Sequence, residues 1–370
     1  MRILFLVYSI FVIGLLPAQA ENAFVIGEQH VLKSKVLGED RPYIVGLPAS
    51  YNDKKYHPQK YPVLYILDGQ AHFHAATGVI NHMSNPLNNG NMRIPEMIVV
   101  AIPNTTDRSR DLTPTNSNFD SMGQKTDKQP TSGGGPKFLE FLEIELIPLI
   151  ESQYRTRPSR TFVGHSLGGL TVLHSLLTQP DLFQNYIAID SSLWWDKEVM
   201  NKWVQDFIPK TKNTKAHVYM SLAEHNSTGD FPSFISMTAS NSFFAETLQK
   251  SPSPDLVTKL QIFPGQDHGS VPLLSLYYGL MHSFDGYKLS METIIAGADA
   301  LSAHYQSFSN KSGMEFLPPE GLVDMLASLG PVALKFSDRK VKALLDLNIA
   351  NYPNSENAKK KLAEFLAKRK

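Results

Sequence analysis

The chain has 370 residues, a formal net charge of zero and no cysteine. A balanced charge, without a basic patch that carries interleaved aromatic residues, gives no indication of nucleic-acid binding. The lack of cysteine excludes disulfide bonds, catalytic thiolates and thiolate metal sites. A hydrophobic content of 42% is enough for the cores of two domains, or for one large α/β domain with additions.

Residues 1–20 have the three parts of a secretory signal peptide. Arg2 supplies a positive charge, residues 3–16 form an apolar segment, and an Ala-Gln-Ala sequence ending at Ala20 is a typical cleavage signal. The apolar segment is too short to span a membrane, and no later segment predicts a transmembrane helix or association with a membrane. We therefore expect cleavage after Ala20 and a periplasmic or secreted protein.

Segments with the composition of strands alternate with helical segments between residues 30 and 284. This alternation predicts an α/β fold, a mostly parallel sheet with right-handed crossovers and helices on both faces. The first two strands read as a hairpin-like opening, and most of the later ones are continuous apolar segments typical of buried parallel strands. The expected strands are residues 30–37, 41–47, 62–68, 97–102, 161–163, 186–189, 217–222 and 259–263. The expected helices are residues 73–83, 136–149, 170–177, 197–207, 240–250 and 270–284, with a kink at Pro148.

The composition changes after about residue 286. Residues 287–370 contain no convincing strand and have two capped helices, which start after Ser337 and Ser355. About one helix-turn-helix pair is too small to form a stable solenoid by itself. We expect a catalytic domain at residues 21–286 and a helical C-terminal extension that packs on this domain or on a partner, such as a second copy in a homodimer.

A strand, a glycine-bounded serine and a helix follow one another at residues 161–177. The sequence Gly-His-Ser-Leu-Gly, from Gly164 to Gly168, has the Gly-x-Ser-x-Gly pattern of the nucleophile elbow of α/β-hydrolases. In such an elbow the serine hydroxyl is lifted off the edge of the sheet, and glycine is needed where a Cβ atom would collide with the neighbouring strand or helix. We therefore predict Ser166 as the nucleophile. The alternative is a glycine-rich turn with an inert serine.

A serine nucleophile needs a base, which in this fold follows the last strand, and an acid that lies between the two in the sequence. His268 follows the strand at residues 259–263 and precedes a helix, so it is the predicted base. Glu224 closes the strand at residues 217–222 and is the predicted acid, which would fix the histidine tautomer and stabilise the imidazolium. The rival acids are Asp230, Asp255 and Asp267, and the remaining alternative is a Ser–His dyad without an acid.

The oxyanion of a tetrahedral intermediate needs hydrogen-bond donors. Leu167 stands at the start of the helix after the nucleophile, so its N–H would be the first donor. Gly69 or Gln70, after the strand at residues 62–68, would supply the second. The alternative for this position is a plain turn that ends the strand.

Two arginines follow the strand at residues 97–102, on the edge where parallel α/β sheets bind ligands. Arg108 and Arg110 are candidate ligands for an anionic or catechol-bearing substrate, because a guanidinium binds such groups through two parallel hydrogen bonds. The equal alternative for Arg110 is a structural pairing with Asp111.

Trp194 and Trp195 also follow a strand, and we expect one to be a platform for the substrate and the other to belong to the core. His72 is expected to line the mouth of the substrate site. Together with His74 and His82 it offers imidazole ligands for zinc, but no further ligand is evident, so we predict no metal and no other cofactor.

With these residues assigned, the chain resembles the putative-esterase branch of α/β-hydrolases. That branch includes the enterochelin and salmochelin trilactone esterases and, more distantly, esterase D and the mycolyltransferases. The resemblance implies that Ser166 and His268 are catalytic, and residues 348–357 look like part of the tetratricopeptide-like extension of some members. The matching segments are residues 65–69, 108–114, 164–169, 191–195 and 267–270.

These features together predict a periplasmic serine esterase that cleaves a small-molecule ester through an acyl-enzyme. Arginines and tryptophans near the expected mouth favour a flat, oxygen-rich aromatic acid, so the predicted substrate is a catecholate siderophore trilactone. A feruloyl-type or general carboxylesterase is the alternative with the same chemistry. The alternative of another class is a non-catalytic binding protein that retains the elbow and uses its helical tail to bind a partner.

Overall fold

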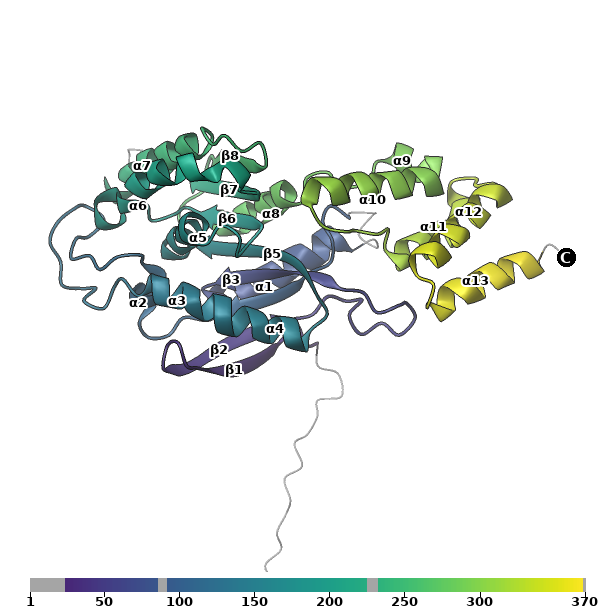
Figure 1. The fold of residues 1–370 in the computed structure, drawn as a ribbon, viewed down its shortest axis with the longest axis horizontal. Helices are drawn as coiled ribbons and strands as arrows, with labels where there is room; N and C mark the ends of the chain where they lie inside the picture. Colours follow the sequence, from purple (N-terminus) through teal and green to yellow (C-terminus); the bar gives the residue numbers. More distant parts are fainter. Residues whose placement is uncertain (1–23, 86–91, 225–231, 369–370) are drawn as a thin grey trace, which may run out of the picture.

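The computed structural model describes residues 24–85, 92–224 and 232–368. The predicted signal peptide and Asp230, one of the rival acids, lie outside these residues. In the described part of the chain, no helix is both long enough and apolar enough to cross a membrane. A sheet covered by helices forms the main body, and the last helices of the chain lie together at one end of it (Figure 1).

An eight-stranded sheet forms the centre of the body, in the order β1-β2-β4-β3-β5-β6-β7-β8. Strands β1 and β2 pair antiparallel with their neighbours, and all the other neighbours pair parallel. This confirms the predicted α/β fold with a mostly parallel sheet. The strands are β1 (Glu28–Ser34), β2 (Glu39–Gly46), β3 (Tyr61–Leu67), β4 (Ile98–Ile102), β5 (Thr156–His165), β6 (Asn185–Ile189), β7 (Ala216–Ala223) and β8 (Leu256–Phe263).

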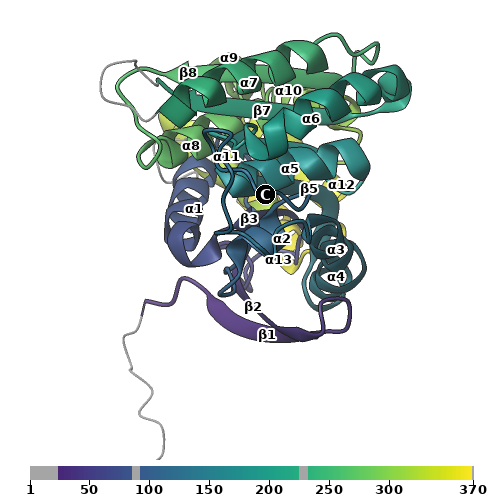
Figure 2. The same cartoon turned by 90° about the vertical axis from the view of Figure 1, so that its left-hand side faces the viewer.

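Helices cover both faces of the sheet because successive side chains of each strand point to opposite faces. In β3, Tyr65 packs in an apolar core with residues of α3, α5, α6 and α7, whereas Leu64 packs on the other face with residues of α1 and α8. Figure 2 shows α1 and α8 on one side of the sheet and α3 and α5 on the other. Every residue of β3, β4 and β6 is buried, which explains their continuous apolar sequences. The helices of the body are α1 (Gly69–Ser84), α2 (Arg108–Leu112), α3 (Gly135–Phe141), η1 (Leu142–Leu146), α4 (Ile147–Gln153), α5 (Leu167–Thr178), α6 (Trp195–Phe207), η2 (Ile208–Asn213), α7 (Pro232–Leu248) and α8 (Val271–Ser283).

The helix expected at residues 136–149 is divided into α3, η1 and α4 by a π-helical turn. Pro148 lies at the start of α4 and has no N–H, so it cannot donate the hydrogen bond that would continue a regular α-helix. The irregularity predicted at this proline is therefore a π turn that precedes it.

Five helices follow α8, and the described residues beyond β8 contain no strand. Tyr305 and Phe308 of α10 pack with Tyr287 and Phe316 in the same apolar core as α1 and α8, so the extension shares a core with the body. Helices α11 to α13 add a smaller core of their own with α10. The helices of the extension are α9 (Met291–Ala296), α10 (Ala298–Ser312), α11 (Glu320–Ala333), α12 (Asp338–Asn351) and α13 (Glu356–Ala367).

Phe308→Ala should destabilise the whole protein, because the Phe308 ring is buried and lies 5.3 Å from Tyr287 and 5.0 Å from Phe316. We expect the free energy of unfolding to fall by about 3–5 kcal/mol, the usual cost of removing a core phenylalanine. Urea denaturation measures this change, with Leu329→Ala as the control because Leu329 is 58% exposed. Equal stability of the two variants would show that the extension does not stabilise the body.

Candidate active site

Ser166 lies in a strained turn between β5 and α5. Its backbone angles, φ 61° and ψ −117°, are rare for any residue other than glycine. Its N–H donates to the carbonyl of Ile189 (2.9 Å), and its carbonyl accepts from the N–H of Ser192 (3.1 Å). These bonds attach the turn to the end of β6 and to the loop that follows it. The turn has the geometry expected of a nucleophile elbow.

The glycines around Ser166 allow strand and helix to approach closely. A Cβ atom at Gly164 would lie 2.3 Å from the carbonyl oxygen of Gly168, and one at Gly169 would lie 2.4 Å from Oγ of Ser191. Both distances are far below van der Waals contact. A larger residue at Gly164 would force the backbone of strand and helix apart, and one at Gly169 would displace the side chain of Ser191. This is the steric reason for glycine at these positions that the sequence pattern predicts.

Asp190 is the carboxylate that pairs with His268. Its Oδ2 lies 2.7 Å from Nδ1 of His268, and its side chain is fully buried. Asp190 directly follows β6, and its N–H donates to the carbonyl of Ser221 on β7 (2.8 Å). The N–H of Ser166 donates a hydrogen bond to the carbonyl of Ile189, the residue before Asp190. The nucleophile therefore lies beside the acid–base pair.

The structure corrects the prediction that Glu224 is the acid. Glu224 is exposed, and its carboxylate accepts a hydrogen bond from the N–H of Gly265 at 3.4 Å. Glu224 follows β7. Asp190 follows β6, which lies next to β5, the strand that leads to the nucleophile. The order nucleophile, acid, base along the chain is as expected, but the acid follows β6 instead of β7.

The rival acids in the described residues have other roles. Asp255 precedes β8, at the opposite end of that strand from His268, and pairs with Lys215 at 3.3 Å. Asp267 accepts hydrogen bonds from the N–H groups of Gly269 and Ser270, and so caps the start of α8. The carboxylate that lies 2.7 Å from the His268 imidazole belongs to Asp190.

His165, the residue before the nucleophile, is a second member of the site that the sequence analysis did not predict. Its ring centroid lies 4.3 Å from that of His268 and 6.0 Å from that of His72. Burial, and then the neighbouring His268, lower the pKa of His165 to about 4, so its ring is neutral at neutral pH. A neutral ring can lie against His268 without repelling the imidazolium that forms during catalysis. The signal for this role was its place inside the Gly-x-Ser-x-Gly pattern.

Arg108 holds the loop after β3 against the elbow. Its Nε and Nη2 donate to the two carboxylate oxygens of Asp68 at 2.6 and 3.0 Å, and Nη2 also donates to the carbonyl of His165 at 3.3 Å. Burial by itself would raise the pKa of Asp68, but the bonds from Arg108 and Asn104 lower it, which keeps the carboxylate ionised. The charge of Arg108 is thus already paired. Arg108 holds this loop in position, whereas its predicted role was to bind substrate.

The three predicted oxyanion donors lie at the starts of two helices. Gly69 and Gln70 begin α1, and Leu167 begins α5. N–H groups in the first turn of a helix have no partner within it and carry partial positive charge. Strands β3 and β5, which lead into these helices, are neighbours in the sheet, so both helix starts lie at the same edge. The arrangement suits an oxyanion, and the role of these donors stays a prediction.

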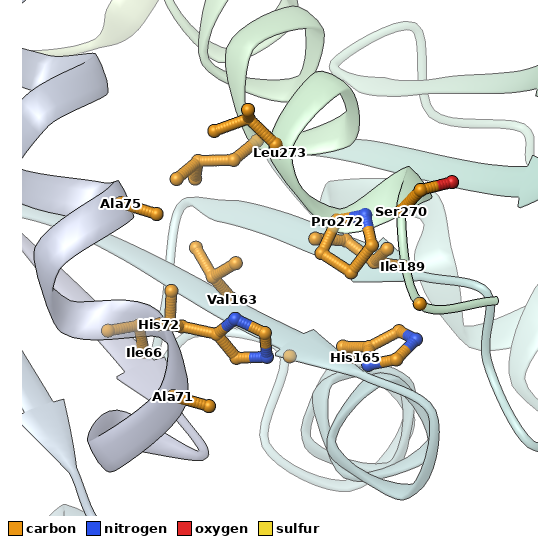
Figure 3. A pocket seen from close by; sticks show the side chains of 13 residues that line it. Ile66, Ala71, His72, Ala75, Val163, His165, Ile189, Ser270, Pro272 and Leu273 are labelled. Atoms are coloured by element: carbon orange, nitrogen blue, oxygen red, sulfur yellow. The ribbon is translucent and has the colours of Figure 1, made fainter. Parts of the chain in front are cut away.

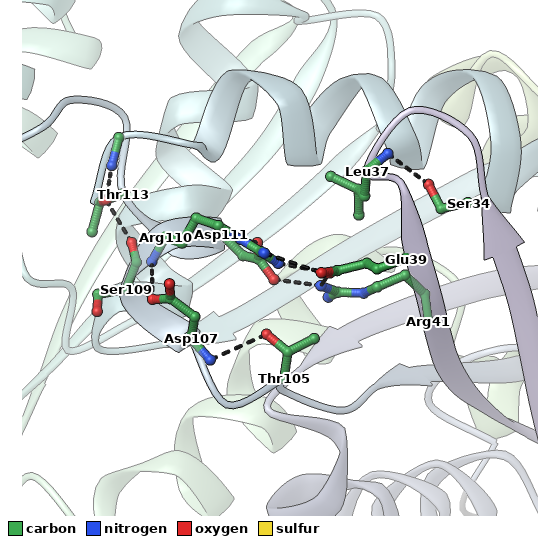
Figure 4. A network of polar contacts seen from close by, with 11 residues as sticks. Ser34, Leu37, Glu39, Arg41, Thr105, Asp107, Ser109, Arg110, Asp111 and Thr113 are labelled. Carbon is green, nitrogen blue, oxygen red and sulfur yellow. Dashed lines mark hydrogen bonds and ion pairs between the residues drawn. The ribbon is translucent and has the colours of Figure 1, made fainter. Parts of the chain in front are cut away.

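Arg110 belongs to an ion-pair network on the β2 side of the sheet (Figure 4). Its Nε donates to Asp111 at 2.8 Å, and its Nη1 and Nη2 donate to Glu39 at 3.0 and 2.6 Å. Arg41 pairs with the same two carboxylates. The bonds to Glu39 and Asp111 raise the pKa of Arg110. The structure therefore favours the structural alternative for Arg110 over the predicted binding of substrate.

The two tryptophans differ in exposure. Trp195 is fully buried, and its Nε1 donates to the carbonyl and hydroxyl oxygens of Thr115 at 3.2 Å. It is therefore a core residue and cannot be a platform for the substrate. Trp194 is half-buried, with its ring 5.7 Å from that of Trp195, and keeps the predicted role of platform.

A cavity of about 250 Å³ lies beside His165, between α1 and α8 (Figure 3). His72, the residue predicted to line the substrate mouth, lines this cavity together with Ser270. Burial lowers the pKa of His72, so the imidazoles in the wall are neutral hydrogen-bonding groups. Mainly apolar walls with a few polar groups are typical of sites for small organic groups. The apolar lining includes Ile66, Ala71, Ala75, Val163, Ile189, Pro272 and Leu273.

One group of metal-type donors occurs in the described part of the chain. Donor atoms of His165, Asp190 and His268 lie within 4.8 Å of one another. Two of these residues are the paired acid and base, so we interpret the group as acid–base machinery. His72 and His74, which the sequence analysis considered as zinc ligands, are not in this group.

Comparison with known proteins places the chain among esterases. A family model described as "Putative esterase" matches residues 34–255, more than half of the chain. The chain belongs to this family. The esterase is 34% identical over 212 residues to ferri-bacillibactin esterase BesA of Bacillus subtilis, covering 55% of this chain and 71% of BesA. It is 30% identical over 182 residues to the siderophore triacetylfusarinine C esterase of Aspergillus fumigatus, covering 43% of this chain and 55% of that protein.

Solved structures agree with this assignment. The crystal structure of an IroE-like serine hydrolase from Shewanella oneidensis superimposes with a TM-score of 0.75 and 30% sequence identity. The match covers 87% of this esterase and 98% of the other chain. The protein is therefore a serine hydrolase of a family that acts on ester bonds, with the α/β-hydrolase fold predicted from its elbow.

Asp190→Asn should lower kcat about 10⁴-fold, because an asparagine favours the wrong tautomer of the base and does not stabilise its imidazolium. Glu224→Gln, a matched change at the carboxylate first predicted, should leave kcat unchanged. Hydrolysis of an aryl ester by both variants measures the difference, with circular dichroism as the check of folding. A larger loss in Glu224→Gln than in Asp190→Asn would contradict the assignment of Asp190.

Proposed function

We propose that this esterase hydrolyses a catecholate siderophore trilactone through an acyl-enzyme on Ser166. The contact between Asp190 and His268, next to the strained turn of Ser166, supports the reaction. The names of its relatives support the substrate class: BesA and two fungal proteins, from Aspergillus fumigatus and Emericella nidulans, are called siderophore or ferri-bacillibactin esterases.

In the proposed reaction, Oγ of Ser166 attacks the ester carbonyl while Nε2 of His268 takes the hydroxyl proton. Asp190 accepts the hydrogen bond from Nδ1–H and stabilises the imidazolium. The N–H groups at the starts of α1 and α5 bind the oxyanion. His268 then gives its proton to the leaving alkoxide, and a water molecule hydrolyses the acyl-enzyme by the same steps. Such acid–base assistance is typically worth about 10²- to 10⁴-fold in rate.

The surroundings of the site offer places for a hydroxylated aromatic ring. The cavity of about 250 Å³ beside His165 has apolar walls and the neutral imidazoles of His72 and His165. Trp194 offers a half-buried ring for stacking. Recognition would therefore depend on shape, stacking and neutral hydrogen bonds, since Arg108 and Arg110 are paired within the protein.

That pairing of the arginines also favours a second candidate, a feruloyl-type or general carboxylesterase. A neutral ester needs no cation in the wall, and the apolar lining of the cavity would accept a short acyl chain as well as a ring. The chemistry at Ser166 would be the same, so a comparison of substrates is needed to separate the two.

The proposed place of action is the periplasm, or the medium after secretion, because residues 1–20 read as a signal peptide.

A homodimer through the C-terminal extension stays a prediction. Light scattering of the mature protein tests it by measuring the mass in solution.

The substrate proposal is tested by measuring kcat/KM for enterobactin, a feruloyl ester and a butyryl ester. We expect enterobactin to be the best substrate and Ser166→Ala to lower kcat about a million-fold if the catalytic residues act as a unit. Trp194→Ala should lower kcat/KM for enterobactin by about 2- to 10-fold, the usual value of an aromatic pair, and leave the butyryl ester unaffected. A higher kcat/KM for the butyryl ester than for enterobactin, in the unaltered protein and in Trp194→Ala, would favour the general carboxylesterase.

A further inference from the structure

A second cavity lies on the opposite edge of the sheet from Ser166. Ser166 follows the C-terminal end of β5, whereas β3 begins at Tyr61 and the loop before β4 carries Glu96. At this edge the body and the C-terminal extension enclose a cavity of about 470 Å³. One wall comes from the loops before β3 and β4, and the other comes from the extension, including Phe316 and Met325.

Aromatic rings form much of the wall of this cavity. Four of them are buried and therefore fixed in place by their neighbours. The face of an aromatic ring is negative and attracts a cation. The rings come from both sides of the cavity: Tyr56 and Tyr61 from the body, and Tyr287, Phe316 and Tyr352 from the segment that follows α8.

Glu96 gives the cavity a carboxylate whose partners in the described residues are the uncharged Ser50 and Gln59. One oxygen accepts from the N–H of Ser50 at 3.2 Å, and the other accepts from Oγ of Ser50 and from Gln59. The described residues provide no ion pair between Glu96 and a lysine or arginine. Burial raises the pKa of Glu96, and the nearby Asp53 raises it further against the effect of the Ser50 bonds. A partly buried carboxylate without a cation is costly, and a cationic ligand would remove that cost.

The other charges in the wall leave an excess of negative charge. Asp53 and Glu320 also line the cavity, and in the described residues neither forms an ion pair with lysine or arginine. The cations in the wall are Lys60 and Arg157. The guanidinium of Arg157 donates to two backbone carbonyls and lies 5.2 Å from the centre of the Phe316 ring, so it is held in the wall. Three carboxylates and two cations therefore face a space bounded by aromatic rings.

We propose that this cavity binds a small organic cation, an amine with an apolar or aromatic body. The ammonium group donates to Glu96, and the body of the ligand lies against the tyrosine and phenylalanine rings. Because the walls come from both the body and the extension, a bound amine holds the two together. This site is separate from the ester chemistry and does not depend on the substrate of Ser166.

Titration calorimetry of the mature protein with three compounds of similar shape tests the proposal. 2-Phenylethylamine is a cation, 2-phenylethanol is neutral and phenylacetate is an anion. We expect the amine to bind and the other two to bind at least tenfold more weakly, because a hydrogen bond to a charged group changes affinity by about 10- to 100-fold. Equal binding of the alcohol or the acid would overturn the proposal.

Glu96→Gln removes the charge and keeps the shape, so it should weaken binding of 2-phenylethylamine by about 10- to 100-fold. Glu292→Gln, at an exposed glutamate on α9, is the matched control and should bind the amine as the unaltered protein does. An unchanged affinity in Glu96→Gln would exclude Glu96 as the partner of the ammonium group and overturn the proposal.

Met325→Trp tests the cavity independently of Glu96, because Met325 is a half-buried residue of its wall on α11. The larger ring should fill the space and abolish amine binding. Phosphonylation of Ser166 blocks the ester site and should leave the affinity for the amine unchanged. Loss of amine binding after phosphonylation, or its survival in Met325→Trp, would place the amine elsewhere and refute the assignment.

Discussion

The parallel pairing of β5 with β6 places the catalytic groups of this esterase. Register between the two strands aligns His165 with Ile189, so that the residues that follow, Ser166 and Asp190, leave the sheet side by side. Both residues have positive φ angles, which turn the chain sharply away from the sheet. The buried carboxylate of Asp190 then fixes His268, which arrives from the loop after β8. A change in the register of this pair would separate the nucleophile from its acid.

Ion pairs hold the loops in place at the edge of the sheet that carries Ser166 and Asp190. Arg108 joins the loop after β3 to the elbow through Asp68 and the carbonyl of His165. Arg110 joins α2 to β2 through Glu39. The cavity beside His165 has no carboxylate, lysine or arginine in its described lining, and burial keeps His165 neutral, so the cavity has little net charge. Such a site distinguishes substrates mainly by shape, stacking and neutral hydrogen bonds, which is consistent with either candidate substrate class.

The C-terminal extension is joined to the body through a shared apolar core. Phe308 and Phe316 pack with Tyr287 on the face of the sheet that α1 and α8 cover. The same contact leaves a cavity at the edge of the sheet opposite the catalytic groups. One segment thus contributes both to the apolar core of the body and to the walls of this second cavity.

The sequence by itself determined the features that depend on residues close together in the chain. The glycines around Ser166, the alternation of strands and helices, and the position of His268 after the last strand all follow from local steric and hydrophobic patterns. Tertiary structure alone decided which carboxylate meets His268, because that depends on the lateral order of β5, β6 and β7. It also decided between the two roles predicted for Arg110, since Glu39, which pairs with Arg110 in addition to Asp111, lies 71 residues away in the sequence. Asp190 and His268 are 78 residues apart, and a contact over such a distance exists only once the whole sheet has formed.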